Sequence, residues 1–391
     1  MIRTGEFGAD HREAVDFAAF TEVAPLRIAS ARSYTRRPTR QIPVGKVPVG
    51  GLAPISVQSM TKTDTRDVRA TVDQIWALEA AGCEIVRVAV PDADAAAAVA
   101  QIRSQIRIPL IVDIHFDYRL ALQCLAAGVD CLRINPGNIG ATWRVQEVIR
   151  AAAERKVPIR IGVNAGSLEK HLLQRFGEPT PEALVESALF HIRILEELNY
   201  PEMKVSLKSS DPRMMIEAYR MLADRVPYPF HLGVTEAGTA FTGAIKSAVG
   251  IGTLLAEGIG DTIRVSLTED STEEIRAGFE ILKALGLRKR GLNVIACPSC
   301  GRVEIDLVGL TKEVEKRLEA LNITRTLTVA VMGCAVNGPG EARGADIGIA
   351  GGKGIGILIK KGQIVRKVKE SELADILVEE VQRLAAEPAE S

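Results

Sequence analysis

The sequence predicts an α/β protein in which an N-terminal (β/α)8 TIM barrel precedes a smaller α/β domain. Eight short runs rich in β-branched residues alternate with helical segments between residues 55 and 285. Their number, and a length of about 230 residues, match a (β/α)8 barrel. After Leu285 this alternation ends and a different order of elements follows. A doubly wound open sheet is the alternative, and the eight-fold count disfavours it.

Residues 1–40 lack apolar periodicity and accumulate arginines, so we expect a solvated, mobile N-terminal tail. A short hairpin is predicted next, because valines flank the turn residues Gly45 and Lys46. The arginines are Arg27, Arg32, Arg36, Arg37 and Arg40, and the valines are Val44, Val47 and Val49.

The barrel is expected over residues 41–287. Helix starts are marked where Thr180 precedes Pro181 and where Ser271 precedes Thr272-Glu273-Glu274. The strands are predicted at 55–58, 85–90, 110–114, 131–135, 159–163, 204–207, 230–234 and 262–267. The helical segments include 67–81, 93–103, 141–155, 181–199, 213–225, 243–257 and 272–285.

The second domain is expected over residues 288–391, after a short linker at 286–291. Its glycine-rich segment 351–354 lacks the order of a phosphate-binding loop and is interpreted as a turn between strands. Strands are predicted at 292–296, 327–332, 345–350 and 355–360, and helices at 311–321 and 370–386.

Composition excludes several classes of protein. Lys plus Arg and Asp plus Glu both number 49, and aromatic residues make up 4%, so neither nucleic acid nor a membrane surface is an expected partner. No apolar run approaches the ~20 residues that span a bilayer. The early residues Asp10, Glu13 and Asp16 also disfavour a secretory signal. We therefore expect a cytoplasmic protein whose six cysteines are thiols or metal ligands.

Three cysteines of the second domain form a candidate metal site. Cys297 and Cys300 make a C-x-x-C motif, and Cys334 lies in a glycine-rich segment that ends in Asn-Gly-Pro-Gly-Glu. Three soft thiolates in one domain favour an iron–sulfur cluster with a fourth ligand that is not cysteine. Structural zinc and unliganded thiols are the alternatives. Cys83, Cys124 and Cys131 are interpreted as small core residues.

Glu341 is the nearest hard oxygen donor, seven residues after Cys334, and could occupy the fourth position of a resting cluster. A surface carboxylate is the alternative interpretation of Glu341.

The predicted C-terminal ends of the barrel strands, where barrel enzymes carry their chemistry, are rich in cations. Many fixed cations at one mouth indicate an anionic ligand, with phosphate or diphosphate the natural match for guanidinium groups. A third to a half of them are expected to pair with carboxylates such as Asp113. His115 and Glu236 are the candidates for proton transfer. The cations are Arg66, Arg87, Arg119, Arg133, Arg160, Lys208 and Arg264.

Long ordered motifs over about residues 41–384 resemble one family. They are ISVQSM at 55–60, HFDYR at 115–119, LRINPGNIG at 132–140, RIGVNAGS at 160–167, GVTEAG at 233–238, GIGDT at 258–262, RVSL at 264–267, and the CPSC and NGPGE motifs. Together they closely resemble the bacterial 4-hydroxy-3-methylbut-2-enyl diphosphate synthases of the non-mevalonate isoprenoid pathway.

The resemblance implies reductive ring opening and dehydration of 2-C-methyl-D-erythritol 2,4-cyclodiphosphate by an oxidoreductase. It further implies a [4Fe-4S] cluster, two electrons from reduced ferredoxin or flavodoxin, and a homodimer in which one subunit's cluster domain caps the other's barrel. The implied cluster ligands are Cys297, Cys300, Cys334 and Glu341. Implied at the substrate are Arg66, Arg119, Arg160, Asn164, Lys208, Arg264 and Ser266 around the diphosphate, and Thr235 and Glu236 at the carbon skeleton.

Two other functions stay open on sequence alone. A pterin-type (β/α)8 transferase resembling dihydropteroate synthase, with structural zinc in its tail, could use the same Arg and Asn strand ends. A metal-stabilised interaction protein could bind phosphorylated partners at a basic mouth.

Overall fold

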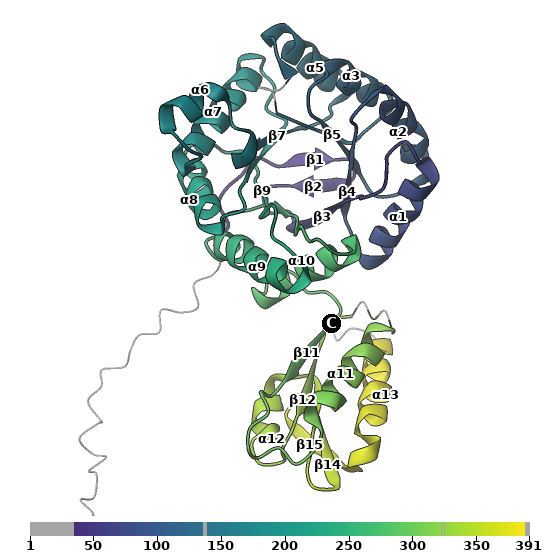
Figure 1. Ribbon diagram of the computed structural model, residues 1–391. Helices are drawn as coiled ribbons and strands as arrows, with labels where there is room; N and C mark the ends of the chain where they lie inside the picture. The colour runs from purple at the N-terminus through teal and green to yellow at the C-terminus, as the bar shows by residue number, and fades with distance from the viewer. Residues whose placement is uncertain (1–34, 136–138, 322, 324, 388–391) are drawn as a thin grey trace, which may run out of the picture. The chain divides into compact units, whose positions relative to one another are not determined.

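The computed structural model describes residues 35–135, 139–321, 323 and 325–387. Its larger sheet holds eight parallel strands in the order β8-β7-β6-β5-β4-β3-β10-β9. A parallel bridge between Val205 and Phe230 joins β8 to β9, so the sheet is nearly closed into a barrel (Figure 1). All eight predicted strands are confirmed: β3 (Ser56–Met60), β4 (Ile85–Ala89), β5 (Leu110–Ile114), β6 (Cys131–Ile134), β7 (Ile159–Asn164), β8 (Met203–Lys208), β9 (His231–Leu232) and β10 (Thr262–Ile263).

A ring of helices surrounds the barrel, and a large apolar core fills the space between helices and strands (Figure 1). The seven predicted helices are confirmed to within three residues at each end. Two shorter helices, α3 and α6, were not predicted. The helices are α1 (Val68–Ala81), α2 (Ala93–Gln105), α3 (Tyr118–Ala126), α5 (Thr142–Arg155), α6 (Lys170–Phe176), α7 (Pro181–Glu197), α8 (Pro212–Ala223), α9 (Ala240–Ala256) and α10 (Ser271–Ala284).

The predicted hairpin closes the N-terminal end of the barrel. Strands β1 (Ile42–Val44) and β2 (Val47–Val49) pair antiparallel across the turn at Gly45 and Lys46. Buried side chains of the hairpin pack against residues at or near the starts of β4, β5 and β6. The contacts join Ile42, Val44 and Val49 to Ile85, Ile111 and Cys131.

The expected tail is wrong for its last residues, because residues 36–40 bind the barrel. Arg36 forms an ion pair of 2.9 Å with Asp261. Arg37 donates to the carbonyls of Val226 and Tyr228, both at 2.5 Å, and lies 3.9 Å from the centre of the Phe230 ring. These arginines satisfy backbone carbonyls and a buried carboxylate instead of solvating a tail. Residues 1–34 of the predicted tail lie outside the described residues.

The linker also contacts the barrel at its N-terminal end. Arg288 donates to the carbonyl of Ile55 at 2.7 Å and pairs with Glu84 at 2.8 Å. Arg290 donates to the carbonyl of Gly82 and lies over the Phe279 ring. The chain therefore leaves the barrel on the face opposite the C-terminal ends of the strands.

The second sheet has the order β11-β12-β13-β14-β15, with β11, β12 and β13 parallel and the last two strands antiparallel. Helices α11 and α13 pack on one face, and α12 with the following 3-10 turn packs on the other. Strand β15 and helix α12 were not predicted, and α11 begins four residues before its predicted start. The elements are β11 (Leu292–Ala296), α11 (Leu307–Glu319), β12 (Leu327–Met332), α12 (Gly338–Glu341), β13 (Ile347–Ala350), β14 (Ile355–Lys360), β15 (Gln363–Lys369) and α13 (Leu373–Ala386).

No helix within the described residues has the length and apolar character needed to cross a membrane.

Candidate active site

The inside of the barrel is lined by charge instead of the branched apolar residues that usually fill it. Successive residues of a strand face opposite sides of the sheet, so every second residue points into the barrel. Between the apolar layer that packs against the hairpin and the C-terminal ends of the strands, these inward positions are almost all polar or glycine. The polar residues and glycines at these positions include Gln58, Arg87, Asp113, Arg133, Arg160, Gly162, Lys204, Ser206, Lys208, His231, Gly233, Thr262 and Arg264.

Asp113 is a counterion shared by several of these cations. Its carboxylate lies 2.9 Å from Arg133 and 3.5 Å from Arg87, and His115 approaches to 3.6 Å. Burial alone would raise the pKa of Asp113, but Arg87 and the neighbouring arginines outweigh burial and lower it to about 2. The prediction that some of the cations pair with carboxylates is confirmed for these two arginines. Arg66, Arg119 and Arg264 pair with carboxylates as well, so the paired share, five of seven, exceeds the expected third to a half.

Two glycines make room for cationic side chains inside the barrel. A Cβ atom on Gly162 would lie 2.2 Å from Nε of Arg133, and one on Gly233 would lie 2.1 Å from Nζ of Lys208. With a side chain at either position, Arg133 or Lys208 would have to move away. The two glycines therefore allow the side chains of Arg133 and Lys208 to lie close against the neighbouring strands inside the barrel.

Five of the predicted substrate residues lie at or just beyond the C-terminal ends of β7, β8, β9 and β10, whereas Arg160, predicted at a strand end, is the second residue of β7 and lies deeper inside the barrel. Arg160 is 1% exposed, and Lys208 is the last residue of β8, opposite Asn164 of β7. Burial, together with Arg160, Arg264, Arg87 and Arg133, lowers the pKa of Lys208 well below its usual value. The five residues are Asn164, Lys208, Thr235, Arg264 and Ser266.

Arg66 and Arg119 are not gathered with the others. Arg66 lies in the loop between β3 and α1, Arg119 lies in the first turn of α3, and each is held by a carboxylate two residues before it. Arg66 pairs with Asp64 at 2.7 Å, and Arg119 pairs with Asp117 at 3.2 Å. A ligand in the mouth would have to compete with these carboxylates for both arginines.

Glu236 has an unusual backbone. Its φ is +52°, in the left-handed region that residues other than glycine rarely adopt, and its side chain is exposed. The preceding Thr235 is anchored by a backbone hydrogen bond of 3.1 Å to the carbonyl of Ser209. Such backbone strain concentrates at functional positions, and nothing in the sequence around Glu236 indicated it.

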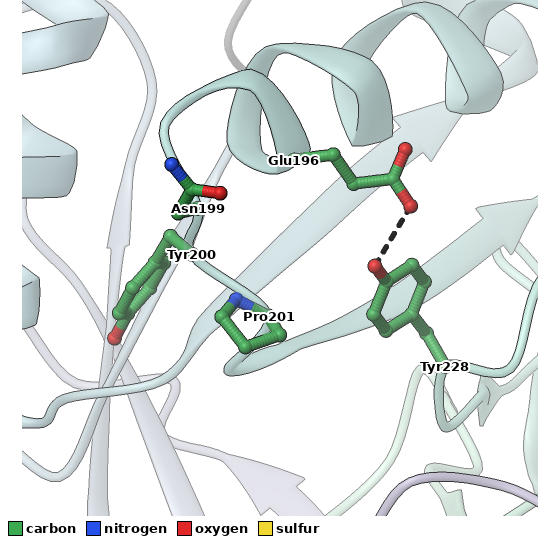
Figure 2. A pocket seen from close by; sticks show the side chains of 5 residues that line it. All are labelled: Glu196, Asn199, Tyr200, Pro201 and Tyr228. Atoms are coloured by element: carbon green, nitrogen blue, oxygen red, sulfur yellow. Dashed lines mark hydrogen bonds between the residues drawn. The ribbon is translucent and has the colours of Figure 1, made fainter.

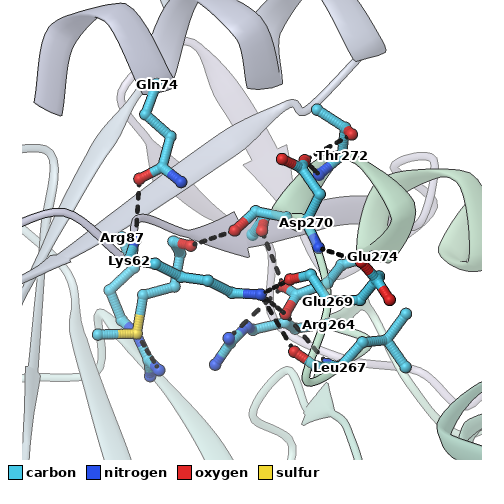
Figure 3. Close-up of polar contacts among 12 residues, drawn as sticks. Lys62, Gln74, Arg87, Arg264, Leu267, Glu269, Asp270, Thr272 and Glu274 are labelled. Atoms are coloured by element: carbon cyan, nitrogen blue, oxygen red, sulfur yellow. Dashed lines mark hydrogen bonds and ion pairs between the residues drawn. The ribbon is translucent and has the colours of Figure 1, made fainter. Parts of the chain in front are cut away.

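A carboxylate that the sequence did not single out also belongs to this end of the barrel. Glu274 of α10 is 1% exposed and contacts Ser59, Lys62, Arg264 and Leu267. Figure 3 shows Glu274 among Lys62, Arg264 and Leu267. In the sequence, Glu274 indicates only the start of a helix.

The cysteine segments lie at the C-terminal edge of the second sheet. Adjacent parallel strands β11 and β12 end there, so Cys297 and Cys334 follow neighbouring strand ends. The N–H of Gly333 donates to Sγ of Cys297 at 3.2 Å. The backbone N–H groups of Asn337, Val336 and Gly338 lower the pKa of the Cys334 thiol, which favours the thiolate. Glu341 ends the short helix α12 that begins at Gly338.

The C-x-x-C turn has a left-handed residue at Ser299, with a φ of +58°. No three His, Cys, Asp or Glu side chains of the described part of the chain are gathered as a metal site would require. The thiols nevertheless suit a metal cluster, because backbone N–H groups aim at the sulfurs of two of them. Cys83, Cys124 and Cys131 are buried, as predicted.

A shallow pocket at the opposite end of the barrel lacks such chemistry. It lies between the end of α7 and the start of β8 and is lined by two tyrosines, an asparagine, a proline and a glutamate (Figure 2). Tyr228 donates to Glu196 at 2.8 Å within it.

Comparison with known proteins agrees with this geometry. The GcpE TIM-barrel domain model matches residues 39–279, and the GcpE protein C-terminal domain model matches residues 293–383. A relative from Geobacter sulfurreducens, named 4-hydroxy-3-methylbut-2-en-1-yl diphosphate synthase (flavodoxin), is 64% identical over 89% of this chain and 98% of its own. A Symbiobacterium thermophilum protein of the same name is 61% identical over 90% of this chain and 95% of its own.

Among solved structures, dihydropteroate synthases match at low similarity. The Xanthomonas albilineans enzyme is 11% identical with a TM-score of 0.43, over 63% of this chain and 99% of that one. The Stenotrophomonas maltophilia enzyme is 13% identical with a TM-score of 0.46, over 63% and 98%. These values carry no argument about function. The two domain models and the relatives confirm the resemblance drawn from the motifs, and the chain belongs to the GcpE family.

Proposed function

We propose that this chain converts 2-C-methyl-D-erythritol 2,4-cyclodiphosphate to 4-hydroxy-3-methylbut-2-enyl diphosphate, an oxidoreductase step of isoprenoid biosynthesis. The single observation that carries the proposal is 64% identity to a synthase of that name across 98% of its length. The charged barrel interior supports it, because a cyclic diphosphate supplies the anion that these cations lack. A pterin-type transferase gains no comparable support from the relatives.

The chain's own residues bind and orient the diphosphate. Arg160, Lys208 and Arg264 converge on one mouth with Asn164 and Ser266, and they neutralise the phosphate that leaves carbon when the ring opens. Arg66 and Arg119 complete the set after exchanging their carboxylates for phosphate oxygens. Thr235 and Glu236 face the carbon skeleton, with Glu236 the proton donor for the hydroxyl that leaves as water.

Cys297, Cys300, Cys334 and Glu341 are the proposed ligands of a [4Fe-4S] cluster. A bound cluster would pass on the two electrons of the external donor one at a time and would provide a Lewis acid for the departing oxygen. The backbone N–H groups around Cys297 and Cys334 stabilise thiolate charge. Flavodoxin, which the relatives' name includes, is the proposed electron donor, and a reducing cytoplasmic location suits the thiols.

We further propose that the enzyme works as a homodimer in which each cluster domain serves the other subunit's barrel. The chain leaves the barrel at its N-terminal face, where Arg288 is tied to Ile55 and Glu84. The mouth lies at the other end of the strands. Phe116 and Phe241 near the mouth are 70% and 79% exposed, and Val336 beside Cys334 is 77% exposed. Contact with another subunit would cover these apolar side chains.

Anaerobic turnover of the cyclic diphosphate with a chemical reductant tests the activity. We expect purified protein to be brown and active, and Cys334→Ser to lose both its colour and its activity. Cys124→Ser is the matched control, since Cys124 is buried among barrel helices far along the chain from the proposed ligands.

The outcomes separate the hypotheses. Colourless protein with stoichiometric zinc would contradict the redox function. Full activity in Cys334→Ser would refute the ligand set while leaving the reaction intact. A metal-stabilised interaction protein predicts no turnover at all.

A further inference from the structure

We infer that Glu274 is a positioning residue that holds Arg264 in the orientation needed to bind the substrate diphosphate. The inference rests on the proposed role of Arg264. Glu274 lies on a helix behind the barrel wall and not at a strand end, so it is not one of the groups expected to touch substrate.

The carboxylate of Glu274 is fixed on both oxygens. Oε1 accepts the backbone N–H of Leu267 at 3.1 Å, and Oε2 accepts the hydroxyl of Ser59 at 2.9 Å. The residue is 1% exposed and lies in the first turn of α10, where the helix N-terminus favours a negative charge. A carboxylate held in this way has little freedom to follow a moving partner.

Arg264 is the partner that this fixed charge orients. Its Nη2 lies 3.5 Å from Oε2 of Glu274, and its side chain is 16% exposed. Positive charges surround Arg264, because Arg87, Arg160 and Lys208 all interact electrostatically with it. Without Glu274, repulsion from these cations would drive the guanidinium toward solvent.

Lys62 ties the same carboxylate to the rim of the mouth. Its Nζ lies 3.8 Å from Oε1 of Glu274 and donates to the carbonyl of Leu267 at 3.1 Å and to that of Glu269. The backbone N–H of Lys62 donates to Oε1 of Gln74 at 2.8 Å. The ends of β3 and β10 are thus locked together around Glu274, as Figure 3 shows.

The test is the dissociation constant of the cyclic diphosphate for the oxidised, cluster-loaded enzyme, which binds without turning over. Glu274→Gln keeps the shape and removes the charge, and we expect it to weaken binding about ten-fold. Arg264→Ala should weaken it at least as much. The double variant should bind within about two-fold of Arg264→Ala, because Glu274 acts through Arg264. Glu273→Gln, on the same helix turn, is the matched control and should bind normally.

Each result has a distinct meaning. An unchanged dissociation constant in Glu274→Gln, or additive losses in the double variant, overturns the positioning role and leaves the proposed site standing. An unchanged value in Arg264→Ala overturns the proposed role of Arg264 and the inference with it. If Glu274→Gln does not fold, Glu274→Asp keeps the charge but withdraws it by one methylene, and normal substrate binding by that variant would overturn the inference.

Discussion

Lys208 shows how one buried cation couples substrate binding to pH. Its pKa is lowered in the free enzyme by burial and by four neighbouring cations. Bound diphosphate adds negative charge beside it and raises that pKa, so binding must take up a proton at any pH between the two values. Affinity should therefore fall as pH rises through this interval. Calorimetric titration of the oxidised enzyme in buffers of different ionisation enthalpy measures the uptake directly.

Lys208→Arg provides the control, because guanidinium stays protonated throughout the range. Proton uptake should disappear in this variant. If proton uptake persists in this variant, another group must take up the proton, such as Lys204, whose pKa is lowered by burial to about 8.

At the scale of single residues, the sequence predicted candidate site residues where both the residue type and its place in the strand pattern were informative. Lys208 and Arg264 were predicted at strand ends and lie there, whereas Arg160, predicted at a strand end as well, is the second residue of β7. Glu274 was missed because a glutamate in a first helical turn already has an ordinary explanation. The left-handed backbone of Glu236 was missed as well, since it depends on tertiary contacts that no local pattern records.

Helix ends offer a test at the scale of the element. Helix α5 ends on Lys156 with a φ of +55°, whereas the end of α3 is followed by Gly128 with a φ of +81°. Lys156→Gly should raise the free energy of unfolding by about 0.5–1 kcal/mol, and Gly128→Ala should lower it by about 1 kcal/mol. A Cβ on Gly128 would meet nothing within 4 Å, so the backbone alone causes the loss. Urea unfolding of the two variants gives both values, and equal signs would contradict the argument.

Elements were predictable where their burial is periodic. The barrel strands bury β-branched residues against the helices, and all eight were found. Strand β15 (Gln363–Lys369) was missed because only Val368 of its seven residues is buried, so it has no alternation to detect. Helix α3 has nine residues, which is too short for a clear helical period.

The proposed dimer makes a prediction for the whole molecule. Cys334→Ser disables the cluster domain and Glu236→Gln disables the barrel, so neither variant alone should turn over substrate. Co-expressed at equal levels, half of the dimers would be mixed, each with one intact pair of domains from different subunits. Activity should return to about a quarter of that of the wild type if the domains work in trans. No recovery in purified mixed dimers would mean that each cluster serves its own barrel.

The hairpin Ile42–Val49 has a consequence for the order of events in the catalytic cycle. Its apolar side chains fill the N-terminal end of the barrel, so within the described residues the barrel interior is open only at the mouth, at the C-terminal ends of the strands. Substrate and product therefore share one opening, and in the proposed homodimer the cluster domain covers that opening during reduction. Substrate binding, reduction and product release must therefore occur in sequence. Movement of the cluster domain away from the mouth can then limit the turnover rate even when the chemical step is fast.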